Sequence, residues 1–565
     1  MLKIRKLLYA LLLGAPLISA ASDGNSCNAC SSNCASAISQ NLWQPRAFSG
    51  YSSLNLIQIK DAYDKELFED ETGKNPVFYM TTAAQYMQSF GSSCKGLGAM
   101  PFWSGTNTMT IGTNDGNSDV DAYQFGMGDV TTPGSITLSP YVQHTGVDFM
   151  FYYMQHKIGR GVVAKVNAPL GAMRIQTNLC ENPALLSDTA DLAWTPPYPA
   201  VPNRPQTLTA AFQGGSVSNN ELLSQVLHPI ALYKGRISCC SLSAVRLADL
   251  SFTVGYNCVN EDRGFLMIGF KTTCPTGNVP TGNYIFEPVF GRAGHWGVGG
   301  ELSASVKCYE HDCSRLSLWA QGEILHLLNG RMPTFRSFDL KQNGKGSKYM
   351  LLQYYAAENP DLTATPSNPT GRVASFITQA VNVTTFPVLS DFGVEGSFAL
   401  MLNYETGNWN AGIGGEVWGR TAEHLSIDFC NSLNYGMVNL NDYAVLGRQI
   451  SKNNETGDLL SYCEPLATIN QSQNRVLTAG QYTNTIKDAR VAANRIPADV
   501  TEALDICGAA APRAVTGKIF GEIGYTWKEE CHNSNLSFFG GAEFTDAHSN
   551  MINLWSVGVK YSFVF

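Results

Sequence analysis

Apolar and polar residues alternate strictly along the last eleven residues of the chain. Trp555, Val557, Val559, Tyr561, Phe563 and Phe565 occupy one set of positions, and the small or charged residues Ser556, Gly558, Lys560 and Ser562 occupy the other. A period of two places successive side chains on opposite faces of a β-strand. The pattern therefore predicts a strand with one oily face and one hydrophilic face, as in a strand that separates lipid from a lumen.

The same alternation recurs upstream in segments of similar length. Strands are predicted at 141–157, 159–168, 247–257, 262–273, 295–307, 314–325, 347–357, 371–381, 391–404, 409–420, 514–528, 535–545 and 555–565. An even total requires at least one more strand from residues 50–130. The fold class that follows is all-β, a transmembrane antiparallel β-barrel of about 14 strands within a range of roughly 12 to 16.

The lengths of the connections support a barrel whose last residue is periplasmic. Connections 529–534, 405–409, 308–313 and 158–160 then fall on the periplasmic side, and the longer connections 421–513, 329–346, 274–290 and 169–240 fall outside. Short periplasmic turns and long outer loops are typical of membrane barrels. Connections 358–370 and 546–550 fit this rule poorly, because the first is long and inside and the second is short and outside.

The two longest outer loops, 169–240 and 421–513, are expected to contain short helices. Candidates lie at 220–227 in the first loop and at 483–494 and 497–506 in the second. Pro497 near the start of the last candidate and Gly508 just beyond it fit the chemistry of helix ends.

The strand that ends in Phe565 resembles the final strand of bacterial outer-membrane β-barrel proteins, whose terminal aromatic residue is read by the assembly machinery. The resemblance covers the last eleven residues specifically and the rest of the chain as a pattern. It implies that the six alternating residues from Trp555 to Phe565 are the assembly signal. It also implies that outer-membrane lipid and the assembly machinery are partners of this chain.

The first 21 residues have the features of a secretory signal peptide. Lys3, Arg5 and Lys6 form a positive region, an apolar run follows from Leu7 to Leu13, and the small residues 19–21 suit cleavage. We therefore expect a signal peptide at 1–21, a cysteine-rich periplasmic or plug segment at 22–50, and the barrel at 51–565. Export and insertion would place the protein in the bacterial outer membrane.

All 15 cysteines follow the signal peptide, so the oxidising compartment favours disulfides. Cys308 and Cys313 flank four residues and are a candidate disulfide across a hairpin turn. For Cys27, Cys30 and Cys34 a disulfide role is favoured over a metal site. The cysteine number resembles that of the cysteine-rich major outer-membrane proteins of intracellular bacteria, which combine pore and structural roles. This resemblance implies disulfide-linked or trimeric self-association.

The predicted inward faces carry the best functional signal. Glu301, Glu395, Glu416, Glu522 and Glu543 each lie near the middle of a predicted strand among glycines and small residues. A ring of such carboxylates lining a lumen would favour cations over anions. The alternative is an internal network of ion pairs, or contacts to a segment folded into the barrel.

These observations favour a porin-like outer-membrane channel for passive passage of small hydrophilic solutes, with a preference for cations. Two alternatives stay open: a structural or adhesive disulfide-linked surface barrel, and a barrel transporter for hydrophobic molecules with an N-terminal plug. The common hydrolase, metalloprotease and nucleotide-binding patterns are absent from the sequence, so no enzyme, cofactor or metal is expected. The formal net charge of −8 argues against a nucleic-acid partner.

Overall fold

The computed structural model describes most of the predicted barrel and parts of the loops. The described residues are 46, 50–63, 76–90, 107–113, 117–138, 140–156, 158–186, 204–214, 231–238, 240–311, 314–328, 334–355, 374–427, 439–445, 467–470, 496–528, 533–545 and 551–564. No helix among these residues is long and apolar enough to cross a membrane.

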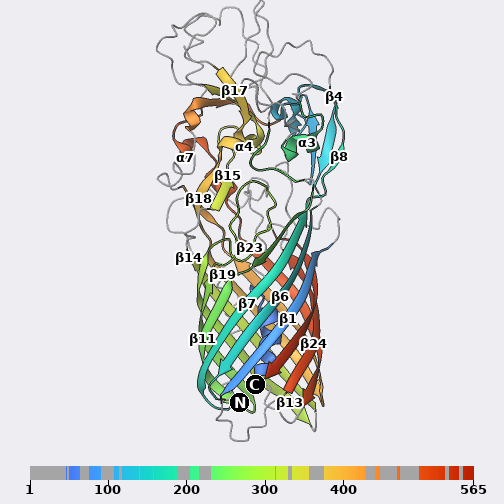
Figure 1. Ribbon diagram of the computed structural model, residues 1–565, viewed down its shortest axis with the longest axis vertical. Helices are drawn as coiled ribbons and strands as arrows, with labels where there is room; N and C mark the ends of the chain where they lie inside the picture. Colours follow the sequence, from blue (N-terminus) through green and yellow to red (C-terminus); the bar gives the residue numbers. More distant parts are fainter. Residues whose placement is uncertain are drawn as a thin grey trace, which may run out of the picture. The chain divides into compact units, whose positions relative to one another are not determined.

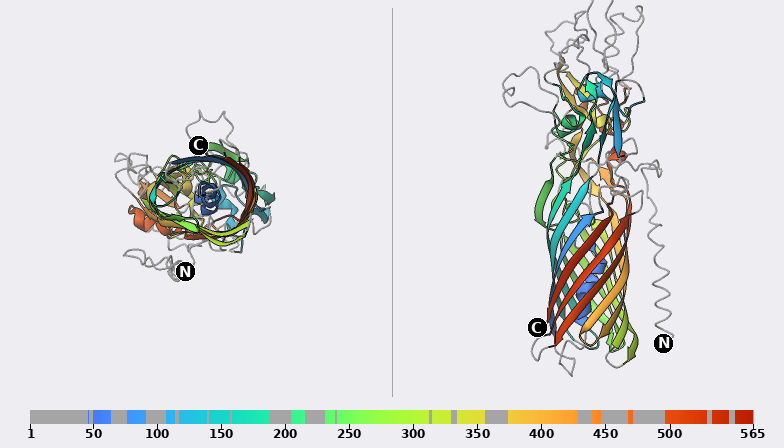
Figure 2. Two further views of the ribbon diagram at one scale, coloured as in Figure 1. Left: turned by 90° about the horizontal axis from the view of Figure 1, so that it is seen from below. Right: turned by 90° about the vertical axis from the view of Figure 1, so that its right-hand side faces the viewer.

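Within the described residues, twelve long antiparallel strands close into a barrel (Figures 1 and 2). In barrel order they are β6 (Tyr141–Met154), β7 (Gly161–Gln176), β11 (Leu250–Glu261), β12 (Gly264–Cys274), β13 (Trp296–His311), β14 (Ser314–Leu328), β19 (Gly393–Thr406), β20 (Trp409–Arg420), β23 (Ala514–Lys528), β24 (Asn533–Thr545), β25 (Leu554–Val564) and β1 (Val77–Ser89). β1 pairs with both β25 and β6, so the sheet closes on itself and satisfies its edges internally. The predicted antiparallel barrel is confirmed.

The two ends of the barrel differ in the length of their connections. At one end, here called the turn end, β11 stops at Glu261 and β12 begins at Gly264, and β19 and β20 are separated by Gly407 and Asn408. At the other end, the cap end, β14 and β19 are separated by residues 329–392 and β20 and β23 by residues 421–513. Short and long connections alternate as predicted, and the short cap-end connection between β24 and β25, residues 546–553, is the expected exception.

The alternation read from the sequence separates the two faces of the wall. In β25 the side chains of Val557 and Tyr561 are exposed on the outside, whereas Ser556, Lys560 and Ser562 are buried inside. In β23, Ile519 and Ile523 point out, and Lys518 and Glu522 are buried. One exception is Phe392, which directly precedes β19 and is fully buried instead of facing outward.

Two predicted barrel strands belong elsewhere. The segments predicted at 347–357 and 371–381 form β16 (Leu351–Tyr355) and β17 (Ala374–Gln379). They belong to a separate sheet, in which β16 pairs with both β17 and β22 (Tyr443–Val445). Strands of five or six residues are too short to span a bilayer, which takes about 9–11 residues. The barrel is therefore at the lower limit of the predicted range. The misfit at 358–370 disappears, because these residues, which lie outside the described ones, fall within a cap-end connection.

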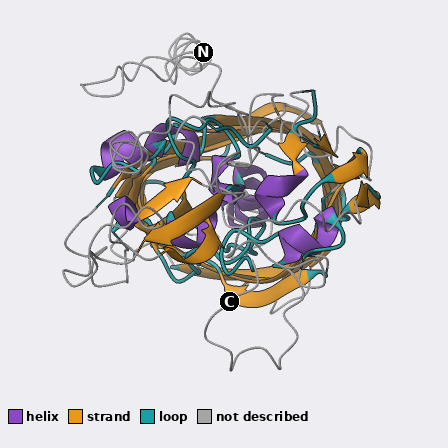
Figure 3. Ribbon diagram, turned by 90° about the horizontal axis from the view of Figure 1, so that it is seen from above, coloured by secondary structure: helices purple, strands orange, loops and turns teal. Residues whose placement is uncertain are grey.

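The long connections carry a layer of small elements at the cap end, here called the cap (Figures 1 and 3). Its described elements are β2 (Thr108–Gly112), β3 (Val120–Asp121), β4 (Val130–Thr132), β5 (Gly134–Thr137), β8 (Cys180–Asn182), β9 (Leu185–Leu186), α3 (Leu208–Gln213), β15 (Thr334–Ser337), β16, β17, α4 (Ala380–Val383), β18 (Thr385–Asp391), β21 (His424–Ser426), β22, α7 (Val500–Ala503) and α8 (Ile506–Ala509). β10 (Leu242–Leu247) extends the barrel edge by pairing with the cap-end half of β7.

The cap has a hydrophobic core of its own. The rings of Phe125, Phe212 and Tyr349 pack with centroids 5.0–6.0 Å apart, and all three side chains are buried. The same cluster includes Met173 and Ile175 of the barrel strand β7, so the cap core is continuous with the barrel.

The helix predictions for the long loops are only partly tested. The candidates at 220–227 and 483–494 lie outside the described residues. The candidate at 497–506 is wrong in detail, since α7 begins after Asp499, whose carboxylate accepts a hydrogen bond from the Thr501 amide at 2.9 Å. Gly508 lies inside α8 and does not end a helix, because the Asp505 carboxylate caps α8 by accepting from the Gly508 amide.

The cap contains a buried cation whose ionisation should couple its stability to pH. Burial lowers the pKa of Lys348 to about 8, and the nearby Asp339 carboxylate opposes this only in part. Because the pKa is depressed on folding, the folded cap binds fewer protons than the unfolded chain between about pH 8 and 10.5, and its stability should rise with pH there. We expect a gain of about 2 kcal/mol between pH 7.5 and 9.5, measured by hydrogen exchange of the β16 amides. Lys348→Met should abolish this gain, and a pH-independent wild type would contradict the prediction.

Candidate functional site: the plugged lumen

A helix fills the lumen of the barrel. α2 (Ser52–Lys60) and the 3-10 turn η3 (Asp61–Tyr63) precede the first barrel strand and lie inside the wall, as the view along the barrel axis shows (Figure 2). Every residue of both elements is buried. α2 carries Ser52, Asn55 and Gln58 as well as apolar residues, which share a hydrophobic cluster with inward wall residues such as Met401 and Phe520, so the helix meets a wall that is partly polar and partly apolar.

The wall caps the amino end of α2. The N-cap residue Tyr51 makes no side-chain capping bond, and the carboxylate of Glu416 in β20 accepts hydrogen bonds from the amides of Ser52 and Ser53, at 2.8 and 3.2 Å. The first amides of a helix lack partners within the helix and carry a partial positive charge. A wall carboxylate therefore supplies here what a local Ser, Thr or Asp supplies in most helices.

Arg46 lies beside the same carboxylate. Its guanidinium forms an ion pair with Glu416, lies 3.4 Å from Glu543 of β24, and donates to the Gly50 carbonyl at 2.6 Å. The guanidinium carbon lies 4.1 Å above the ring of Tyr51. The Tyr51 hydroxyl donates to Glu543 at 3.0 Å. Two wall carboxylates thus hold the chain just before α2.

The carboxyl end of α2 is also fixed by the wall. Lys560 of β25 donates to the Ile57 carbonyl at 2.9 Å and forms an ion pair with Asp61 at 2.7 Å. Lys60 forms an ion pair with Glu522 of β23. A cation at the last carbonyls of a helix complements the negative end of its dipole. The charges of the wall therefore match the polarity of α2 at both of its ends.

Below α2, Tyr63 anchors the chain near the turn end. Its ring stacks on Phe265, with centroids 3.5 Å apart, and its hydroxyl lies 2.6 Å from the Tyr152 hydroxyl and 2.7 Å from Asn257 Oδ1. Arg46, by contrast, pairs with Glu543, two residues from the cap end of β24. The plug, defined as Arg46 and residues 50–63, therefore runs from the cap end toward the turn end.

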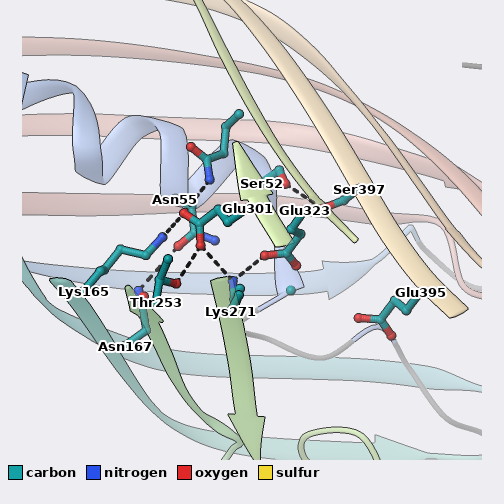
Figure 4. A network of polar contacts seen from close by, with 12 residues as sticks. Ser52, Asn55, Lys165, Asn167, Thr253, Lys271, Glu301, Glu323, Glu395 and Ser397 are labelled. Carbon is teal, nitrogen blue, oxygen red and sulfur yellow. Dashed lines mark hydrogen bonds and ion pairs between the residues drawn. The ribbon is translucent and has the colours of Figure 1, made fainter. Parts of the chain in front are cut away.

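A second network connects residues of the wall on the opposite side of α2 (Figure 4). Glu301 forms ion pairs with Lys165 and Lys271, Lys271 also pairs with Glu323, and Thr253 donates to Glu301 at 2.8 Å. Beside this network, Asn167 of β7 donates to Asn55 of the plug at 3.4 Å. The charges of the network compensate one another within the wall.

The structure places all five predicted lumen glutamates inside the barrel, each next to a cation. Glu301 belongs to the wall network, and Glu395 pairs with Arg292 at 2.8 Å. Glu416, Glu522 and Glu543 pair with the plug. The interior thus follows the alternative interpretation, in which ion pairs and a segment folded into the barrel compensate the carboxylates.

Sequence reasoning found only the start of the segment that fills the lumen. The periplasmic or plug segment is expected at 22–50, which includes Arg46, whereas the helix that fills the lumen lies at 52–60 and the first barrel strand begins at Val77. The predicted signal peptide at 1–21 and residues 22–45 lie outside the described residues. In the sequence, the cations Arg46 and Lys60 flank the apolar-rich segment 54–59, and they were a signal that a charged lumen had a partner there.

The remaining predicted sites lie on the wall. Cys308 is exposed at a register shift in β13, where its thiol donates to the Val306 carbonyl at 3.7 Å. Cys313 lies outside the described residues, so the Cys308–Cys313 disulfide stays a prediction. The proposed assembly signal forms β25, which pairs with β24 and β1 to close the barrel, and Phe565 lies beyond the described residues.

Among the described residues, no group of three or more His, Cys, Asp and Glu side chains is arranged to hold a metal ion.

Comparison with known proteins adds to the fold. No known family and no curated protein matches this sequence. Similar solved structures include an outer membrane channel from Pseudomonas putida F1, with 9% identity over 88% of this chain and 99% of that chain and a TM-score of 0.34. They also include a Pseudomonas aeruginosa FadL homologue (10% identity, 87% and 89% coverage, TM-score 0.24) and a mutant of the TodX monoaromatic hydrocarbon channel (9%, 87% and 90%, TM-score 0.27).

The closed barrel of this chain is established by its own strand pairing, independently of these structures. At such TM-scores the likeness says nothing about what passes through the barrel.

The contacts of Glu416 predict that this residue holds the plug in place. Glu416→Gln removes the charge that pairs with Arg46 and caps α2, which for a buried pair costs roughly 3–5 kcal/mol. We expect the α2 amides to exchange with deuterium at least about a hundredfold faster, as measured by mass spectrometry. Glu323→Gln is the matched control, because it removes an equally buried carboxylate that pairs with wall cations. If both variants accelerate exchange of the α2 amides equally, Glu416 does not stabilise the plug more than other buried glutamates of the wall do.

Proposed function

We propose that this chain is an outer-membrane channel that the plug closes, and that it passes small hydrophilic solutes, preferentially cations, when the plug leaves the lumen. The observation that carries the proposal is the match between α2 and the wall, which caps the helix at both ends with charges of the right sign. Such a protein needs no catalytic group, cofactor or metal.

The outer surface of the barrel supports a place in the membrane. Ile413, Ile519, Phe538 and Val557 are each more than half exposed on the outward face of neighbouring strands. Exposed apolar bands of this kind mark surfaces that contact lipid or another protein. Because the band lies on adjacent strands of a closed barrel, we infer that it faces lipid.

The charges of the interior favour hydrophilic solutes. Beside the charged residues, the buried inward positions include the polar residues Asn403, Asn535 and Ser537, and apolar ones such as Met401 and Phe520. Removal of the plug takes Arg46 and Lys60 away from Glu416, Glu522 and Glu543, so the remaining wall is more negative than the closed barrel. A negative wall favours cations.

The cap favours a second candidate function, attachment at the cell surface. It is a folded layer with its own buried aromatic core, which is more structure than a diffusion channel needs. In that case the barrel would anchor the cap and the plug would keep it sealed. The two functions differ in whether the plug ever opens.

A charge on the outward face should destabilise the barrel if that face contacts lipid. A lysine at the bilayer midplane of such a barrel costs roughly 2–4 kcal/mol. We expect Ile519→Lys to lower the free energy of unfolding in lipid vesicles by about this amount, measured by urea titration. Tyr233→Lys replaces an equally exposed side chain in the cap and should have little effect. An unchanged free energy of unfolding for Ile519→Lys would rule out the lipid contact.

A disulfide between plug and wall should control conductance. The hydroxyl oxygens of Ser52 and Ser397 lie 2.5 Å apart, so cysteines at these two positions would point their sulfur atoms toward each other. In planar bilayers we expect wild type to be mostly closed and Arg46→Ala to conduct. Arg46→Ala combined with Ser52→Cys and Ser397→Cys should stay closed until dithiothreitol is added.

Two controls separate the effect of the lock from effects on native cysteines. Arg46→Ala alone and Arg46→Ala with only Ser52→Cys should conduct with or without dithiothreitol. Steady conductance by the oxidised double-cysteine variant would refute plug closure. If no variant conducts, either with or without dithiothreitol, the result would favour the attachment function over the channel.

A further inference from the structure

Three charged side chains stand at one level of the wall. The strand register pairs Glu416 of β20 with Lys518 of β23, and Lys518 with Glu543 of β24. All three side chains are buried on the inward face. The wall therefore presents two carboxylates around one cation at this level. The three side chains together leave one negative charge without a partner on these strands.

Arg46 fills that place with the geometry of a bound ligand. Nη2 and Nη1 of its guanidinium point to different carboxylates, those of Glu416 and Glu543. The face of the guanidinium lies near two aromatic rings, with its carbon 4.1 Å from the Tyr51 centroid and 5.5 Å from that of Trp418. In-plane ion pairs combined with aromatic contacts on the face suit a planar guanidinium and not a tetrahedral ammonium.

One carboxylate of this place has a partner on the wall itself. Thr516 of β23 donates to Glu543 at 2.5 Å, whereas the hydrogen bonds to Glu416 come from the plug, from Arg46, Ser52 and Ser53. The Trp418 side chain is almost fully buried two residues from Glu416 along β20. Lys518, which the register places between the two glutamates, lies 4.4 Å from the Tyr51 ring. Glu543 therefore keeps its bond to Thr516 if the plug moves away, and Glu416 becomes free to bind another donor.

We propose that Glu416, Glu543 and Trp418 form a guanidinium-binding subsite on the barrel wall, which Arg46 occupies as an internal ligand in the closed channel. Small cations that carry a guanidinium group are then the solute class that the open channel binds, and they compete with Arg46 for the subsite. This inference rests on the proposed function, since it names the solutes of the same lumen.

The subsite can be tested by replacing the missing side chain with a soluble ion. Arg46→Ala leaves a guanidinium-shaped space between Glu416, Glu543 and the two rings. In planar bilayers, methylguanidinium at millimolar, non-denaturing concentration should restore closure of Arg46→Ala in a saturable way. Methylammonium has the same charge and should act at least about tenfold more weakly, because it cannot form the forked contact.

Variants of the wall provide the matched control. In Arg46→Ala the further substitution Glu416→Gln should remove the response to methylguanidinium, whereas Lys307→Ala, which alters an ion pair at the turn end, should preserve it. Equal responses to methylguanidinium and methylammonium would reduce the subsite to a general charge effect and overturn the proposal. A conducting Arg46→Ala channel that ignores methylguanidinium would overturn the subsite and leave the channel standing.

Binding is also measurable without conductance. Isothermal titration calorimetry of full-length Arg46→Ala in detergent should show methylguanidinium binding that Glu416→Gln weakens by at least about tenfold. Such binding in a protein that never conducts would keep the guanidinium subsite and overturn the channel. No binding by Arg46→Ala, with its fold intact by circular dichroism, would overturn the subsite.

Discussion

The central constraint on this structure is that charges enclosed by the barrel need partners of the opposite sign. A closed sheet satisfies its own backbone, but every second side chain of each strand points into a narrow interior, and many of these are Glu, Asp, Lys or Arg. Glu301 and Glu323 find their cations on other strands of the wall. Glu416 and Glu522 find theirs on the plug. The plug is thus part of the charge balance of the barrel and not an insertion into a finished pore.

This balance explains how a short helix is stable in a polar lumen. α2 has nine residues, too few to be stable alone in water, and it lacks a local capping side chain at its start. Glu416 and Lys560 supply the missing partners at its two ends. Because these contacts are directional and charged, they fix the position of the helix along the barrel axis, which unspecific hydrophobic packing would not do.

Which parts of the structure could be predicted depends on how far apart in the sequence the interacting residues lie. The barrel strands were visible because lipid on one side and a hydrophilic interior on the other impose a period of two within each strand, as in Ala514–Lys528. The inward position of Glu416 and Glu522 follows from the same period. α2 gave no comparable signal, since the residues that stabilise it lie 364 positions away for Glu416 and 503 for Lys560. The segments of β16 and β17 were predicted as barrel strands because a short strand has the same alternating sequence pattern in a barrel and in a small sheet of the cap.

The position of the plug in the sequence determines when it can bind during assembly of the barrel. α2 comes before every barrel strand, yet Lys560, which binds its last turn, lies in the final strand β25. A segment exported first therefore has no complete binding place until the last strand has paired with β1. Binding of α2 and closure of the barrel therefore form one cooperative event. A barrel in which β25 has not paired with β1 cannot retain the plug.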